Sequence, residues 1–108
     1  MEITFDDFVK LDLQIGKVLE AQQVVDSKKL IKLLVDFGSE TRQCVAGLLT
    51  YYEPEYLVGK KFVFLLNLPK RKLMGLESEC MVLAAEDTDG NVSLVVPEKD
   101  ISVGSKLG

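Results

Sequence analysis

The chain has 108 residues, of which 47% are apolar and 28% charged, and its formal net charge is −4. These values are typical of a folded globular protein and exclude a disordered chain. One domain usually has this length, so we expect residues 1–108 to form a single domain. The sequence contains no histidine, the side chain most often used for acid–base catalysis near neutral pH. We therefore expect a binding protein rather than an enzyme.

The charges are unevenly distributed along the chain. Residues 1–25 and residues 84–108 each carry a net charge of −3, whereas the residues between them carry +2. The overall negative charge disfavours general binding of polyanions, because repulsion from phosphate opposes it. A folded molecule with this distribution can still present one positive face on an acidic body, and the local field then decides what it captures.

The first expected element is a short helix over residues 5–10. Thr4 and Asp7 have the spacing of a capping box, and apolar residues follow them at helical spacing. A short helix of this kind typically covers the end of a small barrel. Alternating apolar residues then predict three strands in a meander, the first of them bent at Gly16. These strands are expected over residues 13–25, 31–37 and 41–46.

A second short helix is expected at residues 54–57, because proline suits the first turn of a helix. An Asp-Gly pair predicts a tight turn at residues 88–91. The remaining strands are expected over residues 61–67, 81–86 and 92–96, followed by an apolar tail. Three meander strands, a connecting helix and two more barrel strands match the OB-fold. The expected fold class is all-β, a five-stranded Greek-key barrel with short N-terminal and connecting helices.

The segment between the expected strands at 61–67 and 81–86 is a candidate binding loop. Three consecutive cations, Lys70, Arg71 and Lys72, stand beside the apolar pair Leu73 and Met74. Positive charge attracts phosphate, and flexible apolar groups hold unstacked bases, so this composition favours nucleic-acid binding. The alternative is a loop whose charges only keep it solvated.

Other sequence features argue against a metal, a cofactor, secretion or a membrane span. Cys44 and Cys80 each lie in an apolar, strand-like context, which favours buried reduced thiols. The alternative, a disulfide between them, would require their strands to pair. No metal-ligand spacing occurs, and we expect neither a metal nor a cofactor. The N-terminus has no basic segment followed by an apolar one, so it is not a secretion signal. No apolar run approaches the roughly 20 residues of a membrane span, and we expect a cytoplasmic protein.

Five stretches, spread in order along the whole chain, have a familiar pattern: residues 8–18, 29–38, 42–47, 67–72 and 75–81. Together they resemble the tRNA-binding domain family, which includes a small stand-alone tRNA-binding protein and the C-terminal dimerisation domain of methionyl-tRNA synthetases. The resemblance implies an OB-fold barrel, a homodimer built through both chain ends, and binding of tRNA by shape rather than sequence.

The resemblance also implies a set of tRNA-binding residues. Asn67, Arg71, Lys72, Ser78 and Met81 match the family's loop and strand motif, and Lys32 and Arg42 match basic positions on the open barrel face. Lys70 completes the run of cations. The lysines and arginines are expected to contact phosphates, and the asparagine and serine to bond sugars or base edges. Met81 is expected either to support an unstacked base or to join the core.

Three single residues and one loop motif depart from the family pattern. The family's loop usually reads Lys-Pro-Arg-Lys, whereas residues 69–72 read Pro-Lys-Arg-Lys, which keeps the cations but exchanges the first two positions. The family usually has arginine where Gln14 stands, so one cation of the first strand is missing. Glycine is usual where Cys80 stands. Glutamine is common where Glu79 stands, and the carboxylate adds negative charge beside the expected binding residues. These departures bear on affinity more than on fold.

The expected function is structure-dependent, sequence-independent tRNA binding by a dimer, assisting a tRNA synthetase such as methionyl-tRNA synthetase. Apolar residues at both chain ends favour the dimer, because exposed apolar patches mark interfaces. The alternative is a CsaA-type export chaperone, a relative that uses a similar dimeric barrel to bind unfolded polypeptide.

Overall fold

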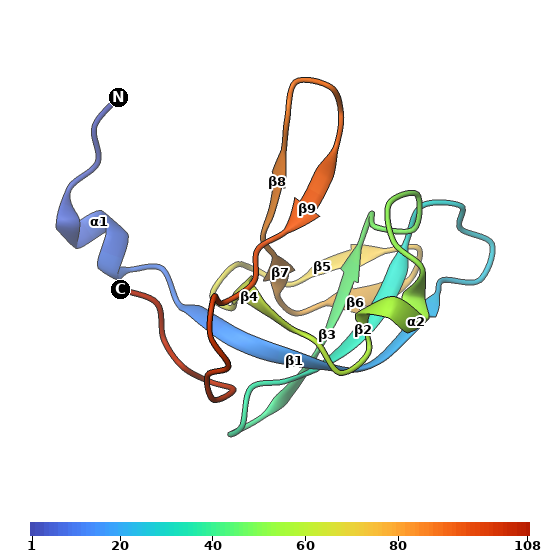
Figure 1. Cartoon of the computed structure of the whole chain (residues 1–108), viewed down its shortest axis with the longest axis horizontal. Helices are drawn as coiled ribbons and strands as arrows, with labels where there is room; N and C mark the ends of the chain where they lie inside the picture. The colour runs from blue at the N-terminus through green and yellow to red at the C-terminus, as the bar shows by residue number, and fades with distance from the viewer.

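The computed structural model describes all 108 residues and is built around one curved antiparallel sheet (Figure 1). The sheet has five strands in the order β3-β2-β1-β4-β7, and a backbone bond from Glu79 N–H to Gln43 O joins β3 to the segment just before β7, which brings the two edges together. The expected all-β, OB-like barrel is confirmed. Its strands are β1 (Leu13–Gln23), β2 (Ile31–Asp36), β3 (Thr41–Ala46), β4 (Lys61–Leu65) and β7 (Met81–Val82).

The barrel interior is filled by alternate residues of these strands. In β2, Ile31, Leu33 and Val35 are fully buried, whereas the residues between them are partly exposed. Burying each such side chain contributes roughly 1.5–3 kcal/mol. Inside the barrel the rings of Phe37 and Phe64 meet edge to face, with centroids 5.4 Å apart. The period-two pattern of the sequence therefore defines the core face.

The long strand β1 pairs with β4 along its first half and with β2 along its second half. The expected bend at Gly16 is misplaced, because the register shift lies between Val18 and Glu20. Gly16 is needed for another reason. A Cβ atom there would lie 2.6 Å from both Val35 Cγ1 and Phe37 Cε1, so only glycine fits against the core.

The two helices have different positions. The helix α1 (Phe5–Val9) has the expected capping box, but it buries no residue and stands away from the barrel (Figure 1). The expectation that it covers the barrel end is wrong. Instead, α2 (Pro54–Leu57), which begins and ends as expected, buries Leu57 completely against the core. Neither helix is long and apolar enough to cross a membrane.

The segment expected as one long loop contains a β-hairpin, formed by β5 (Arg71–Leu73) and β6 (Leu76–Ser78). The two turn residues, Met74 and Gly75, have φ of +50° and +80°. This is the combination of a type I′ turn, whose twist matches that of the flanking strands. Met74 conceals the turn in the sequence, since side chains other than glycine, asparagine and aspartate rarely adopt a positive φ.

The strand expected at residues 81–86 is divided in the structure. β7 pairs with β4, whereas β8 (Ala84–Glu86) leaves the barrel and pairs with β9 (Val92–Leu94) in a separate two-stranded sheet that projects from the molecule (Figure 1). At the point of departure, Leu83 N–H donates to Val63 O in β4, and Leu83 O accepts from Val95 N–H. The barrel thus holds Leu83, whereas β8 beyond it is exposed along its whole length and Leu94 of β9 returns to the core.

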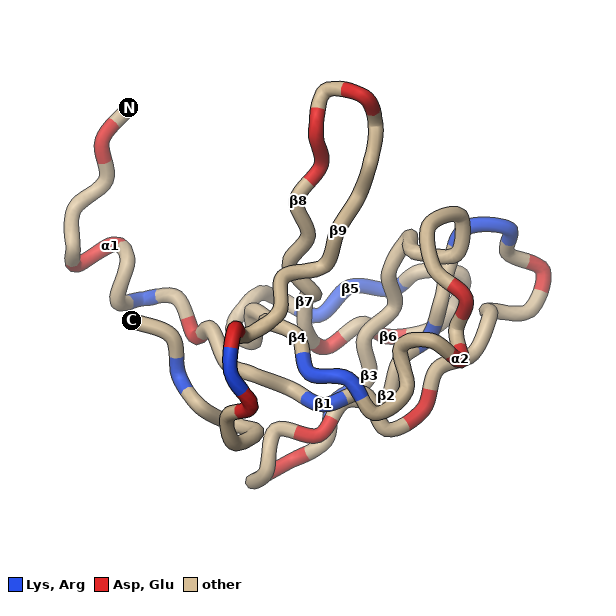
Figure 2. The backbone as a smooth tube through the Cα atoms, in the orientation of Figure 1, with Lys and Arg blue, Asp and Glu red and all other residues tan.

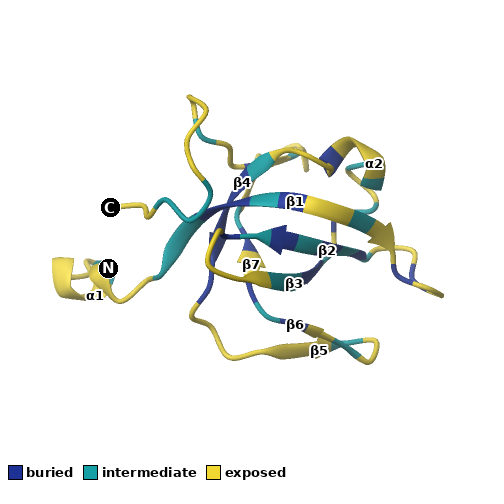
Figure 3. Cartoon of the chain, turned by 90° about the horizontal axis from the view of Figure 1, so that it is seen from below, coloured by how far each residue is buried: buried dark blue, intermediate teal, exposed yellow.

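The C-terminal tail runs beside the first half of β1. Gly104 N–H donates to Ile15 O, Ile15 N–H to Ser105 O, and Leu107 N–H to Leu13 O. The tail therefore ends close to α1, and both ends of the chain lie at the end of the barrel away from α2 (Figure 3).

Candidate nucleic-acid interface

The hairpin of β5 and β6 lies beside β3 and exposes most of its residues (Figure 3). Two of its cations, Arg71 and Lys72, are exposed and form no ion pair within the chain. Lys70 differs, because its Nζ lies 3.5 Å from Glu79 Oε2 and 3.8 Å from Glu77 Oε1. Arg71 and Lys72 are therefore the cations of this hairpin that remain available to an anionic partner.

A pocket of about 320 Å³ opens between the hairpin and β3. We call it the hairpin pocket. Its walls are mostly apolar, and Arg71 is the one charged residue that lines it. Met81, expected as a base support or a core residue, lines this pocket and is 45% exposed, so it is not a core residue. The remaining lining residues are Leu30, Cys44, Val45, Ala46, Gly47, Leu68, Pro69, Leu73, Ser78, Cys80 and Val82.

Asn67 and Ser78, expected to bond RNA, make bonds within the protein. Asn67 Oδ1 accepts from Asp12 N–H at 2.9 Å, and Asn67 Nδ2 donates to Lys10 O at 2.6 Å. These two bonds join the N-terminal segment to the end of β4. Ser78 is buried, and its Oγ accepts from Val45 N–H at 3.0 Å and donates to Cys80 O at 3.1 Å. These two side chains position the elements that border the hairpin pocket.

Arg42 also has an internal role. Its Nη1 donates to Leu66 O at 2.8 Å and to Glu79 O at 3.1 Å. Arg42 thus joins β3 to the residue after β4 and to the residue after β6. Its Nε lies 2.9 Å from Glu40 Oε1. This ion pair lowers the pKa of Glu40 and raises the pKa of Arg42. The sequence pattern did not reveal the bonds to Leu66 and Glu79, since these residues lie 24 and 37 positions away along the chain.

Lys32 and Arg42 do not form the shared basic track expected from the sequence. Arg42 pairs across the ladder with Val35, whose side chain is in the core, whereas Lys32 alternates with the core residues of β2 and faces outward. Since successive side chains of a strand point to opposite faces, Lys32 and Arg42 lie on different faces of the sheet. Lys32 does share the outer face with Gln43, whose Nε2 donates to Glu77 O of the hairpin.

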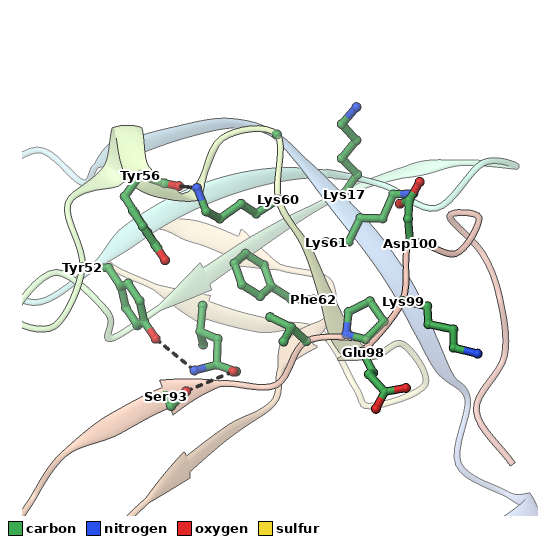
Figure 4. A pocket seen from close by; sticks show the side chains of 14 residues that line it. Lys17, Tyr52, Tyr56, Lys60, Lys61, Phe62, Ser93, Glu98, Lys99 and Asp100 are labelled. Atoms are coloured by element: carbon green, nitrogen blue, oxygen red, sulfur yellow. Dashed lines mark hydrogen bonds and ion pairs between the residues drawn. The ribbon is translucent and has the colours of Figure 1, made fainter.

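A second, larger hollow of about 660 Å³ lies where α2, β4 and β9 meet, and four lysines line it (Figure 4). Two of them already have partners. Lys61 Nζ donates to Asp100 Oδ1 at 2.8 Å, which lowers the pKa of Asp100. Lys60 Nζ donates to Tyr56 O and lies 3.9 Å from the centre of the Tyr56 ring. The unpaired lysines at its border are Lys17 and Lys99.

The tyrosines of this hollow are not free to stack on bases. The rings of Tyr52 and Tyr56 stack on each other, with centroids 5.9 Å apart, and Lys60 covers Tyr56 as well. Tyr52 Oη accepts from Leu94 N–H at 3.0 Å (Figure 4). These contacts cover the end of the barrel, so the hollow is a weaker candidate than the hairpin pocket.

Comparisons with known proteins agree with the resemblance found in the sequence. The sequence model of the family described as "Putative tRNA binding domain" matches residues 13–106. The chain belongs to this family. Methionine–tRNA ligase of Methanocaldococcus jannaschii is 55% identical over 98 residues, covering 91% of this chain and 15% of the relative. The enzyme of Archaeoglobus fulgidus is 51% identical over 106 residues, covering 98% of this chain and 16% of the relative.

Solved structures show the same fold. The MetRS-related protein from Pyrococcus horikoshii has a TM-score of 0.94 and 41% identity, and the chaperone CsaA from Bacillus anthracis has a TM-score of 0.90 and 33% identity. In both cases the match covers the whole of each chain. The tRNA-binding domain thus spans only about 15% of the ligases that it resembles, but all of these two proteins.

Proposed function

We propose that this domain binds tRNA by its shape, without reading its sequence, through the hairpin of β5 and β6. The observation that carries the proposal is the pair of unpaired cations, Arg71 and Lys72, on an exposed hairpin beside an apolar pocket. Lysine and arginine neutralise phosphates, and arginine can bond one phosphate through two N–H groups. Contacts of this kind position a nucleic acid but carry no sequence information.

The hairpin pocket adds a second kind of contact to the proposal. Its apolar walls, including Leu73 and Met81, suit an unstacked base, and Arg71 at its border suits the phosphate of the same nucleotide. Figure 2 shows positive charge on β5 and negative charge on the projecting hairpin of β8 and β9. This distribution orients a polyanion toward β5 and away from the acidic hairpin.

The other expected contacts fall into two groups in this proposal. Lys32 and Lys70 extend the positive charge around the hairpin, although Lys70 shares its charge with Glu77 and Glu79. Arg42, Asn67 and Ser78 hold the site in shape through their internal bonds, and any RNA contact by them is an addition to that role. In the proposed dimer, the hairpins of two copies grip one tRNA on behalf of a synthetase such as methionyl-tRNA synthetase.

A gel-shift titration tests the proposal. Intact tRNA is expected to bind more tightly than an unstructured RNA of equal length. Arg71→Ala is expected to weaken binding of several tRNA species about equally, by roughly tenfold for one lost charged hydrogen-bonding group. Lys99→Ala is the matched control, because Lys99 is an unpaired cation at the other hollow. Equal binding of both RNAs, or equal effects of both substitutions, would contradict the proposal.

The salt dependence of the same titration indicates whether one hairpin or two hairpins contact each tRNA. Two unpaired cations on each of two copies neutralise about four phosphates, so log affinity is expected to fall with log salt at a slope between about −2.8 and −3.6. A single copy would give about half of this slope. A flat response to salt would rule out binding through phosphate.

A chaperone function like that of CsaA is the second candidate, favoured by the full-length structural match and by the apolar lining of the hairpin pocket. An apolar segment of an unfolded polypeptide would occupy the pocket in place of a base. Suppression of aggregation of an unfolded client that persists at high salt, together with absent tRNA binding, would favour this candidate, because apolar contacts are not screened by ions.

A further inference from the structure

Two buried cysteines lie together at the floor of the hairpin pocket. Cys44 is in β3, and Cys80 is in the short connection between β6 and β7. The residues before them are joined, since Glu79 N–H donates to Gln43 O at 2.8 Å. Both thiols line the same pocket and belong to the same cluster of buried residues. Folding therefore places two thiols that are 36 positions apart in sequence on one pocket wall, close enough for each to affect the pKa of the other.

The surroundings of the two thiols differ. Hydrogen bonds from the Cys80 thiol, from Val82 N–H and from Ser78 lower the pKa of Cys44 despite its burial. The hydrogen bond to Cys44 and burial raise the pKa of Cys80. The thiolate is the reactive form, so the scheme below gives the first step to Cys44 and the second to Cys80, an order that the single variants test.

We propose that Cys44 and Cys80 form an oxidation site that a peroxide converts into an intramolecular disulfide, reached through the hairpin pocket. Cys44 thiolate attacks one peroxide oxygen, the O–O bond breaks, and a sulfenic acid and one water form once the leaving oxygen takes up a proton. Cys80 sulfur then attacks the sulfenic sulfur, the S–O bond breaks, and a second water leaves. Two thiols lose two electrons and two protons, and one hydrogen peroxide is reduced to two waters.

The disulfide changes the pocket, and this consequence rests on the proposed function. A disulfide bond is about 2 Å long, shorter than the contact between two unbonded sulfur atoms, so its formation draws β3 and the connection after β6 together. Ser78 and Met81 flank Cys80 and line the pocket. We therefore expect the oxidised domain to bind tRNA about threefold or more weakly than the reduced domain.

The chemistry is tested on the folded domain without RNA. After treatment with hydrogen peroxide, the protein is expected to lose both free thiols and two hydrogen masses, and non-reducing peptide mapping is expected to link the Cys44 and Cys80 peptides. Two free thiols after this treatment, or disulfides only between chains, would overturn the proposal. The wild-type mapping needs no variant, so it decides the question even where a cysteine substitution fails to fold.

Single variants assign the roles of the two thiols. In Cys80→Ser, the reaction is expected to stop at a sulfenic acid on Cys44, which dimedone traps. In Cys44→Ser, Cys80 is expected to remain a thiol under the same conditions. Trapping on Cys80 with none on Cys44 would overturn the assignment.

The link to RNA binding has its own measurement. The affinity for tRNA is compared between the oxidised domain, the oxidised domain after treatment with dithiothreitol, and the untreated domain. Loss on oxidation with recovery on reduction supports the link, and equal affinities overturn it. If the untreated domain binds no tRNA, the proposed function and the link both fail, whereas the mapped disulfide still stands.

Discussion

Single side chains decide how the candidate site keeps its shape. Ser78, Asn67 and Arg42 each have polar groups that could face RNA, yet their hydrogen bonds go to the protein's own backbone. An N–H or C=O group that folding removes from water needs a partner, and leaving it unpaired costs more than a single hydrogen bond contributes. Such residues therefore contribute to the site by holding together the barrel segments that border it.

We expect Ser78→Ala to lower the free energy of unfolding by about 1–3 kcal/mol, because Val45 N–H then loses its bond in a buried position. Urea denaturation measures the change. Ser39→Ala is the matched control, since Ser39 is exposed in a turn, and its stability is expected to stay within about 0.5 kcal/mol of the wild type. Equal stability of the two variants would show that the Ser78 bonds contribute nothing.

At the level of elements, the barrel depends on the close packing of β1 against the side chains of the core. β1 pairs with β4 along its first half and with β2 along its second half, so it joins the meander to β4. Gly16 lies where β1 passes closest to the core aromatic rings, with Phe64 Cδ1 only 3.0 Å from where a Cβ would stand. The absence of a side chain at this position thus lets the sheet close around Phe37 and Phe64.

We expect Gly16→Ala to destabilise the domain by about 1–3 kcal/mol, because the added methyl group overpacks a filled core. Thermal and urea denaturation measure the loss. Gly47→Ala is the matched control: nothing lies within 4 Å of its Cβ position, so we expect little change in stability there. A neutral Gly16→Ala would mean that Val35 and Phe37 can move aside without cost.

At the scale of the whole molecule, exposed apolar residues gather at the end of the barrel that holds both chain ends. α1 and the segment before it expose Ile3, Phe5 and Val9, and the C-terminal tail exposes Leu107, which lines a hollow together with Phe5 and Val9. Helix α1 buries none of its residues within the chain, so the barrel does not bury the apolar side chains of this helix. A second copy placed against this end would cover these residues and complete the proposed dimer.

We expect the wild-type domain to sediment as a dimer at micromolar concentration, and Phe5→Glu to raise the dimer dissociation constant about 30-fold or more, the scale of a lost aromatic anchor. Val25→Glu is the matched control, because Val25 is 82% exposed and Phe5 75%, but Val25 lies between β1 and β2. A monomeric wild type, or equal effects of the two variants, would contradict the dimer.

Local patterns in the sequence determined the family, the strands of the meander and the helix that starts at Pro54, because alternation, turn residues and proline act over a few neighbouring positions. The hairpin of β5 and β6 was not predicted, since methionine is not a typical turn residue, although Met74 has φ +50° in the turn. Only the tertiary structure decided which distant residues come together. Glu79 lies 37 positions from Arg42, Val45 lies 33 positions from Ser78, and Cys80 lies 36 positions from Cys44. A polar side chain has the same bonding capacity in any sequence, and folding alone determines whether backbone, solvent or RNA comes within reach of it.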